Sequence, residues 1–287
     1  MNTTTTEQMN TTTTEQIIPT GFSNLDEALG GGFRRGASTL LMGEAAAGIT
    51  VLALNMATLL VVKGFKVVYI TTEDHPRELE PKMVSALCEV PYEKIKDRVD
   101  LSKFNARQTQ VYEGLRLSLQ SSSFLFIHED RPLEIQAQSD PETAWAVAIE
   151  QAAAQMGRVD YVIFDGLRQG THYDRSVECL MRLAKAHNLH LIVTLRSMPP
   201  SSITADAHEG VPCVPAARTD LAAHMAVIVG ITSLLDLDST GNPIPQGALF
   251  SDEQFLDVSK NRFGASVRVP VRRNFKYQRF DEVSTQQ

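Results

Sequence analysis

One octapeptide constrains the fold of this chain more than any other segment. Residues 43–50 read GEAAAGIT, and they follow an apolar run at 38–42 and precede a longer apolar run that begins at Thr50. The short run is typical of a buried strand and the longer one of a helix. Because Gly43 and Gly48 permit backbone conformations that other residues avoid, the octapeptide predicts a tight turn from a strand into a helix.

The alternation of strands and helices continues beyond this turn. Runs of β-branched and aromatic residues predict further strands at 66–71, 124–128, 160–164 and 189–194. Helices are predicted around 77–88 and at 141–156, where Asp140 can cap the helix and Pro141 suits its first turn. Strands that alternate with helices predict an α/β fold with a mainly parallel central sheet flanked by helices.

The two ends of the chain depart from this alternation. Four strand-like runs, at 226–231, 255–259, 266–272 and 275–280, are expected to add antiparallel strands to the sheet edge. A Ser-, Pro-, Ala- and Gly-rich stretch from 199 to about 218 predicts a long loop of the functional or disordered kind. The octamer MNTTTTEQ occurs twice in residues 1–16, and so polar a segment cannot bury enough surface to fold. We therefore expect a disordered duplicated leader at 1–16 and one domain at 17–287.

Composition limits the possible partners and compartments. The net charge of -7 argues against a continuous basic surface for duplex DNA, although a ring can concentrate its few cations in a central channel. No apolar run approaches the roughly 20 residues that cross a bilayer, and no signal-peptide layout begins the chain. The isolated cysteines Cys88, Cys179 and Cys213 favour neither disulfides nor a zinc site. We expect a cytoplasmic protein that does not contact membranes.

The octapeptide also has the spacing of the phosphate-binding P-loop, G-x-x-x-x-G-K-[ST]. In order, its residues are Gly43, Glu44, Ala45, Ala46, Ala47, Gly48, Ile49 and Thr50. Backbone N–H groups of such a loop point at phosphates, and the Thr50 hydroxyl can hold Mg²⁺, so ATP and Mg²⁺ are the expected ligands.

The octapeptide departs from the pattern at one position. Ile49 stands where the pattern has the lysine that neutralises the phosphates. Lys63, about three and a half turns along the helix, cannot reach them. A plain glycine-rich turn is the alternative, but the place between a strand and a helix favours the P-loop.

Two acidic residues follow predicted strands. Glu73 comes just after the strand at 66–71, and Asp165 ends the strand at 160–164. The carboxyl ends of parallel strands meet at the edge of the sheet where ligands bind, so both acids are expected beside the P-loop. An aspartate after a buried strand is typical of the Walker B acid, which organises Mg²⁺. Either acid alone could simply cap a helix, but the convergence of three strand ends favours a site.

Several segments together resemble a known family. Residues 20–26, TGFSNLD, and 30–36, GGGFRRG, resemble the entry segment of the RecA, KaiC and DnaB-type ATPases. Residues 69–74, YITTED, and 162–168, VIFDGLR, are more similar to the plasmid RepA hexameric helicases. Residues 259–264, SKNRFG, resemble the K-N-R-x-G finger of replicative helicases. The resemblance covers about residues 19–280 and implies a RecA-like P-loop NTPase fold.

The resemblance also implies roles for individual residues. Glu73 would polarise the attacking water, and Asp165 and Thr50 would hold Mg²⁺. Lys260 and Arg262 would reach the nucleotide of the neighbouring subunit as trans-acting fingers, although a solvated charge pair in a hairpin is the alternative. Arg196 stands where replicative helicases carry a glutamine sensor and could replace it.

Ring-forming relatives imply further partners. The family forms hexameric rings, and the loops after the fourth and fifth strands, at 166–176 and 198–219, would face a central channel. Candidate contacts to single-stranded DNA in these loops are Arg168, Arg175 and Arg218, although such residues are often ordinary loop residues.

Three functions remain open from the sequence. The first is an ATP-driven hexameric DNA helicase of the plasmid or phage replication type, impaired by Ile49. The second is a non-catalytic pseudo-ATPase that regulates or loads another protein. The third is a KaiC-like signalling ATPase. Without the P-loop lysine, the sequence leaves open whether the chain hydrolyses ATP.

Overall fold

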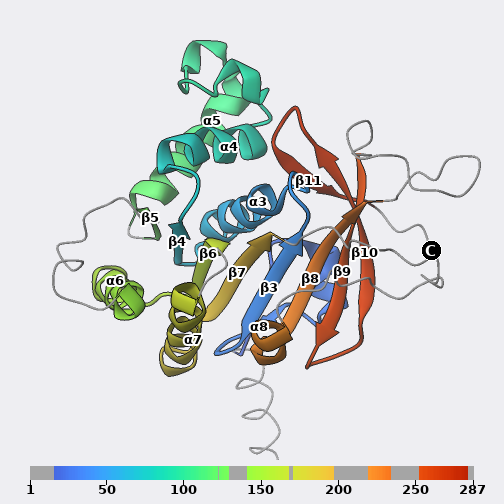
Figure 1. Ribbon diagram of the computed structural model, residues 1–287. Helices are drawn as coiled ribbons and strands as arrows, with labels where there is room; N and C mark the ends of the chain where they lie inside the picture. The colour runs from blue at the N-terminus through green and yellow to red at the C-terminus, as the bar shows by residue number, and fades with distance from the viewer. Residues whose placement is uncertain are drawn as a thin grey trace, which may run out of the picture.

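A computed structural model describes residues 16–121, 123–128, 141–167, 171–196, 219–233 and 252–283. Its centre is a nine-stranded sheet in the order β11-β10-β9-β8-β3-β7-β6-β4-β5, with helices on both faces (Figure 1). The strands are β3 (Ser38–Gly43), β4 (Val67–Thr71), β5 (Phe124–His128), β6 (Tyr161–Leu167), β7 (His190–Arg196), β8 (Val227–Ser233), β9 (Glu253–Asn261), β10 (Val267–Asn274) and β11 (Arg279–Glu282). A separate small hairpin joins β1 (Ile17–Ile18) to β2 (Phe33–Arg34).

Helices connect the strands and cover the sheet. The helices are α2 (Ser23–Ala28), α3 (Ile49–Val62), α4 (Pro76–Cys88), α5 (Ala106–Gln120), α6 (Pro141–Met156), α7 (Thr171–Ala186) and α8 (Thr219–His224), with short 3-10 turns η1 (Tyr92–Lys94) and η2 (Leu101–Lys103). None of the helices in the described ranges combines the length and the hydropathy of a membrane-spanning segment.

Strand alternation builds a core on each face of the sheet. Successive side chains of a strand point to opposite faces. In β3, Leu41 joins the core formed with α3 and α4, whereas Leu40 and Met42 join the core formed with α6 and α7. Helix α3 is apolar on nearly all sides because it lies between the sheet, α4 and the hairpin β10–β11. This burial fixes the start of α3 against the end of β3.

The strand register decides which residues share an edge of the sheet. Strands β8, β3, β7, β6, β4 and β5 run parallel to one another, and Gly43 pairs with both Arg196 and Ile231. Thr71 pairs with Asp165 on the adjacent strand. The carboxyl ends of β3, β4, β6 and β7 therefore meet at one edge, where an open α/β sheet binds its ligands.

The α/β class and the mainly parallel sheet are confirmed, and so are the predicted bounds of β5 and α6. Two predictions for the carboxyl-terminal strands were wrong. Strand β8 pairs parallel to β3, so the antiparallel additions begin only with β9. The run 275–280 is mostly a turn, because residues 275–278 reverse the chain between β10 and β11, with Gln278 at a φ of 50°.

Sequence reasoning missed four helices, α2, α5, α7 and α8. In α5 only Leu115 is fully buried, so the apolar periodicity of this helix is weak. Helix α7 begins at Thr171, inside the segment 166–176 that was predicted as a loop. The duplicated leader, apart from Gln16, and the loop 199–218 lie outside the described residues.

His190 shows how the amino ends of the strands are packed. Its ring is stacked on Phe33, with the ring centroids 4.3 Å apart. Its Nδ1 lies 2.8 Å from the Arg34 carbonyl oxygen, and its Nε2 lies 3.0 Å from the Thr39 hydroxyl. A neutral ring satisfies both contacts by donating from Nδ1 and accepting at Nε2. Burial lowers the pKa of His190 to about 4.

We expect His190 to make the free energy of unfolding fall as the pH drops from about 6.5 to about 4. In this window the unfolded chain binds a proton at residue 190 and the folded chain does not, which removes about 3 kcal/mol at most. Urea unfolding across this range, compared with the non-titrating His190→Gln variant, isolates this group because all others are shared. Equal pH slopes for the two proteins would contradict a neutral buried His190.

Candidate functional site

The octapeptide forms a loop at the carboxyl edge of the sheet, between β3 and α3. Gly48 has a φ of 95° and Ala46 a φ of 67°, both in the left-handed region, so the loop is tightly wound. Helix α3 begins at Ile49, and the N–H groups of its first turn have no carbonyl partners within the helix. The helix dipole adds partial positive charge at the same place, which suits an anion such as phosphate.

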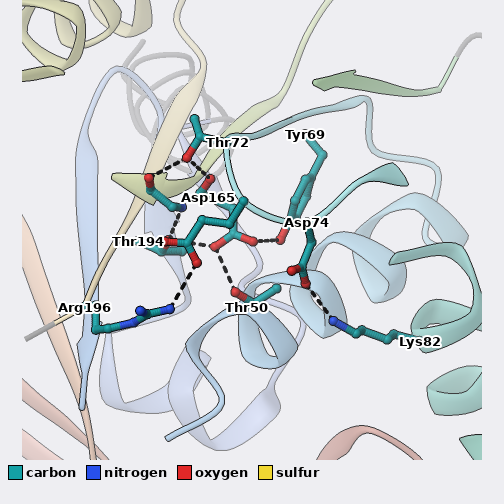
Figure 2. Close-up of polar contacts among 10 residues, drawn as sticks. Thr50, Tyr69, Thr72, Asp74, Lys82, Asp165, Thr194 and Arg196 are labelled. Atoms are coloured by element: carbon teal, nitrogen blue, oxygen red, sulfur yellow. Dashed lines mark hydrogen bonds and ion pairs between the residues drawn. The ribbon is translucent and has the colours of Figure 1, made fainter. Parts of the chain in front are cut away.

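Asp165 lies behind this loop with its carboxylate buried. It accepts hydrogen bonds from the hydroxyls of Tyr69 at 2.7 Å, Thr194 at 2.7 Å and Thr50 at 3.3 Å (Figure 2). Burial raises the pKa of Asp165, and the hydrogen bonds from Thr194 and Tyr69 oppose that shift. The three hydroxyls come from α3, β4 and β7, so the carboxylate joins three elements at one point.

Thr50 and Asp165 together suit a magnesium ion. Both offer oxygen atoms, which Mg²⁺ prefers, and Mg²⁺ usually takes only one or two protein ligands and completes its shell with phosphate oxygens and water. Within the described ranges no group of three or more His, Cys, Asp or Glu side chains forms a metal site. The residues therefore fit a Mg²⁺ that arrives with a nucleotide better than a permanently bound metal.

Glu73 lies at the solvent side of the same edge, just after β4. Its Oε2 is 3.1 Å from Nη2 of Arg196, and the two side chains are 41% and 62% exposed. A Cβ atom at Gly166 would lie 2.6 Å from the Thr72 hydroxyl oxygen and 3.0 Å from Cγ of Glu73, so this position has room only for glycine. The next acid, Asp74, is instead paired with Lys82 at 2.7 Å (Figure 2).

Lys260 and Arg262 lie at the opposite edge of the sheet. Strand β9 is antiparallel to β8, and Asn261 pairs with Val227 at the amino end of β8. Nζ of Lys260 donates to the carbonyls of Ala222 and Ala223 at 2.7 and 2.9 Å, and Arg262 donates to Ala223 at 2.9 Å. These carbonyls end helix α8, where positive charge is favourable. The structure thus keeps both cations away from the P-loop of their own chain.

The predicted channel residues are only partly described. Arg168 and Arg218 lie outside the described residues. Arg175 is exposed, but it belongs to helix α7 and not to a loop, which corrects the prediction.

Arg273 also lies at the loop, although the sequence did not predict it as a site residue. Arg273, near the end of β10, donates from Nη1 to the carbonyl of Ala46. A Cβ atom at Gly48 would lie 2.9 Å from Cζ of Arg273. Because β10 runs in the same direction as β8, its end returns to the P-loop edge. The only signal in the sequence was the position of Arg273 just past a predicted strand.

Solved structures match this arrangement over nearly the whole chain. One that is described as an ATPase domain matches with a TM-score of 0.70 and 16% identity, over 97% of this chain and 96% of that one. A DnaB-like replicative helicase, described with its interactions with primase, matches with a TM-score of 0.68 and 15% identity over 97% and 67% of the two chains. The RadB recombinase matches with a TM-score of 0.57 and 18% identity, over 93% and 100%. This chain has the fold of the RecA-type P-loop ATPases.

The sequence comparisons agree with this fold. A family model described as "ATPase: KaiC" matches residues 18–114, which include the entry segment, the P-loop and Glu73. No curated protein matches the sequence. The predicted RecA-like fold is therefore confirmed by the solved structures, and the family model agrees with it over residues 18–114. At such low identities the structural likeness establishes the fold alone, because proteins that share a fold can have unrelated activities.

We expect Tyr69→Phe to lower the free energy of unfolding by about 1.5–3 kcal/mol, because a buried carboxylate would lose a hydrogen-bond donor. Tyr112→Phe is a matched control, since the half-buried Tyr112 hydroxyl has no hydrogen-bond partner among the described residues. Urea unfolding at pH 7 measures both. Equal losses in the two variants would show that the bond to Asp165 contributes nothing to stability.

Proposed function

We propose that residues 17–287 form the motor ATPase domain of a ring-shaped DNA helicase of the plasmid or phage replication type. The observation that carries the proposal is the contact of Thr50 with the buried Asp165 beside a RecA-type P-loop. A structural turn has no need for a threonine hydroxyl and a carboxylate at this place. An Mg²⁺–ATP site needs both.

Each part of the site has a role in ATP hydrolysis. The loop N–H groups and the start of α3 bind the phosphates, and the Thr50 hydroxyl is a direct ligand of Mg²⁺. Asp165 holds the ion through water. Glu73 orients the attacking water and accepts its proton, which its solvent-facing position permits. Arg196 orients Glu73 through their ion pair. Because Arg196 is also next to the loop, it can interact with the terminal phosphate of ATP.

The far edge of the sheet supports a ring. Lys260 and Arg262 lie too far from the P-loop of their own chain to act there, so their role requires the nucleotide of a neighbouring chain. Six chains that each offer this edge to the next site form a closed hexamer. Single-stranded DNA is the proposed ligand of the channel, with Arg168, Arg175 and Arg218 as phosphate contacts. The proposed compartment is the cytoplasm.

A KaiC-like signalling ATPase is the second candidate, and the match of the KaiC model to residues 18–114 favours it. A non-catalytic pseudo-ATPase that regulates or loads another protein is a third, because Ile49 replaces the P-loop lysine. Stimulation of hydrolysis by single-stranded DNA separates the helicase from the other two.

We expect Glu73→Gln to bind ATP with the affinity of the wild type and to hydrolyse it at least ~100-fold more slowly, because a general base contributes a factor of this size. The matched control is Glu78→Gln, an exposed acid of α4, which should leave both quantities unchanged. Calorimetric titration with Mg²⁺–ATP and a phosphate-release assay measure them. A wild type that does not bind ATP would exclude the helicase and the signalling ATPase, and one that binds without turnover would favour the pseudo-ATPase.

We expect Arg262→Ala to abolish hydrolysis and leave ATP affinity nearly intact, because a finger acts on the transition state. Arg107→Ala, an exposed arginine of α5, serves as the control. Mixing Arg262→Ala with Glu73→Gln subunits should restore part of the activity, since some interfaces then pair an intact Glu73 with an intact Arg262. An inactive Arg262→Ala that never recovers in verified mixed rings would overturn the trans-acting role.

A further inference from the structure

The P-loop lacks a cation at the position where the pattern has one. Ile49 is half-buried, and its Cγ1 would lie 3.1 Å from a Cβ atom on Gly43, so its side chain packs toward β3 and the core. An apolar side chain there contributes nothing to the neutralisation of phosphates. A triphosphate bound in this loop would need positive charge from another part of the chain.

Arg273 brings a guanidinium to the loop from β10. Its bond to the Ala46 carbonyl and its approach to Gly48 place it over the centre of the octapeptide. The side chain is half-buried, and its Cζ lies 4.3 Å from the centroid of the Phe275 ring. A planar guanidinium stacked on an aromatic ring is held in a defined orientation.

The hairpin that carries Arg273 is fixed to helix α3. The Asn55 side chain accepts a hydrogen bond from the backbone N–H of Phe280 at 2.8 Å and donates to the carbonyl of Gln278 at 3.1 Å. Phe280 is buried, and its ring would lie 3.2 Å from a Cβ atom on Gly48. The position of Arg273 relative to the loop is therefore set by the fold.

Among the described residues, no carboxylate pairs with the guanidinium of Arg273. Other arginines of the same antiparallel strands pair with carboxylates, namely Arg268 with Asp257, Arg272 with Glu253 and Arg279 with Glu89 and Asp281. Within the part of the chain that the structure describes, Arg273 has no such pairing. Burial lowers its pKa, but a guanidinium starts from so high a value that it remains charged at neutral pH.

We propose that Arg273 supplies, from within the same chain, the positive charge that the P-loop lacks, and that its guanidinium binds phosphate oxygens of a nucleotide in the loop. The inference rests on the proposed function, in which the loop binds ATP. The Nη1 group of Arg273 donates to the Ala46 carbonyl, and the remaining N–H groups of the guanidinium are suited to bind phosphate oxygens. Arg273 thus takes the electrostatic role of the absent lysine from a different element of the fold.

The test compares Mg²⁺–ATP affinities by calorimetry. Arg273→Met keeps an unbranched stem over Phe275 and removes the charge, and it should weaken binding at least about 10-fold. Arg272→Met, the neighbouring exposed residue on β10, should bind like the wild type. Ile49→Lys should restore the affinity of Arg273→Met and should have a smaller effect in the wild-type background, because either cation alone serves the loop. Melting curves verify that each variant folds.

The outcomes separate this inference from the proposed function. If the wild type binds ATP and Arg273→Met binds it equally well or more tightly, the inference is overturned and the P-loop function stands. If only variants with Ile49→Lys bind ATP, the inference is also overturned, because Arg273 then does not replace the lysine. If neither the wild type nor Ile49→Lys binds, both fail.

A measurement without substitutions covers the case in which Arg273→Met does not fold. Phenylglyoxal modifies arginine side chains, and mass spectrometry of the wild type can follow Arg273 and Arg272 separately. Mg²⁺–ATP should slow the modification of Arg273 and leave Arg272 unaffected. Equal rates at Arg273 with and without saturating ATP would overturn the proposed contact.

Discussion

The arrangement of the site depends on one buried carboxylate. Asp165 accepts hydrogen bonds from hydroxyls on α3, β4 and β7, and residues of all three elements pack in one hydrophobic core. A buried carboxylate costs folding free energy unless its oxygens accept hydrogen bonds. The three hydroxyls must therefore stay within hydrogen-bond distance of Asp165, which holds α3, β4 and β7 together at this edge of the sheet. The same requirement holds Thr50 at the first turn of α3 and thereby fixes the end of the P-loop.

This constraint also separates the chemical roles of the two acids. Burial raises the pKa of Asp165, which disfavours its charged form, so on the proposed function the binding of Mg²⁺ would be linked to the loss of any proton. Glu73, by contrast, is 41% exposed and paired with the exposed side chain of Arg196. A carboxylate in contact with solvent can exchange protons with water, as a general base must. The buried acid suits the metal and the exposed acid suits the water.

The sequence predicted the half of the site that depends on local order. Thr50, Glu73 and Asp165 each lie next to the end of a parallel strand, and such ends meet at one edge whatever the strand order. The sequence did not predict the positions that depend on strand direction. Once β8 is parallel to β3, the antiparallel β9 takes Arg262 to the far edge and β10 brings Arg273 back. Local periodicity contains no information on either direction or pairing.

The strands β9 and β10 therefore bring arginine side chains to both edges of the sheet. Arg262 directly follows β9 at the amino edge, and Arg273 lies near the end of β10 at the carboxyl edge. On the two proposals above, the first cation acts on the nucleotide of the next subunit and the second on the nucleotide of its own. A lysine at residue 49 would take its position from α3, whereas Arg273 takes its position from β10, which pairs with the strand that precedes the finger residue Arg262. On these proposals, the cations for two neighbouring nucleotides would therefore lie at opposite ends of one antiparallel strand pair.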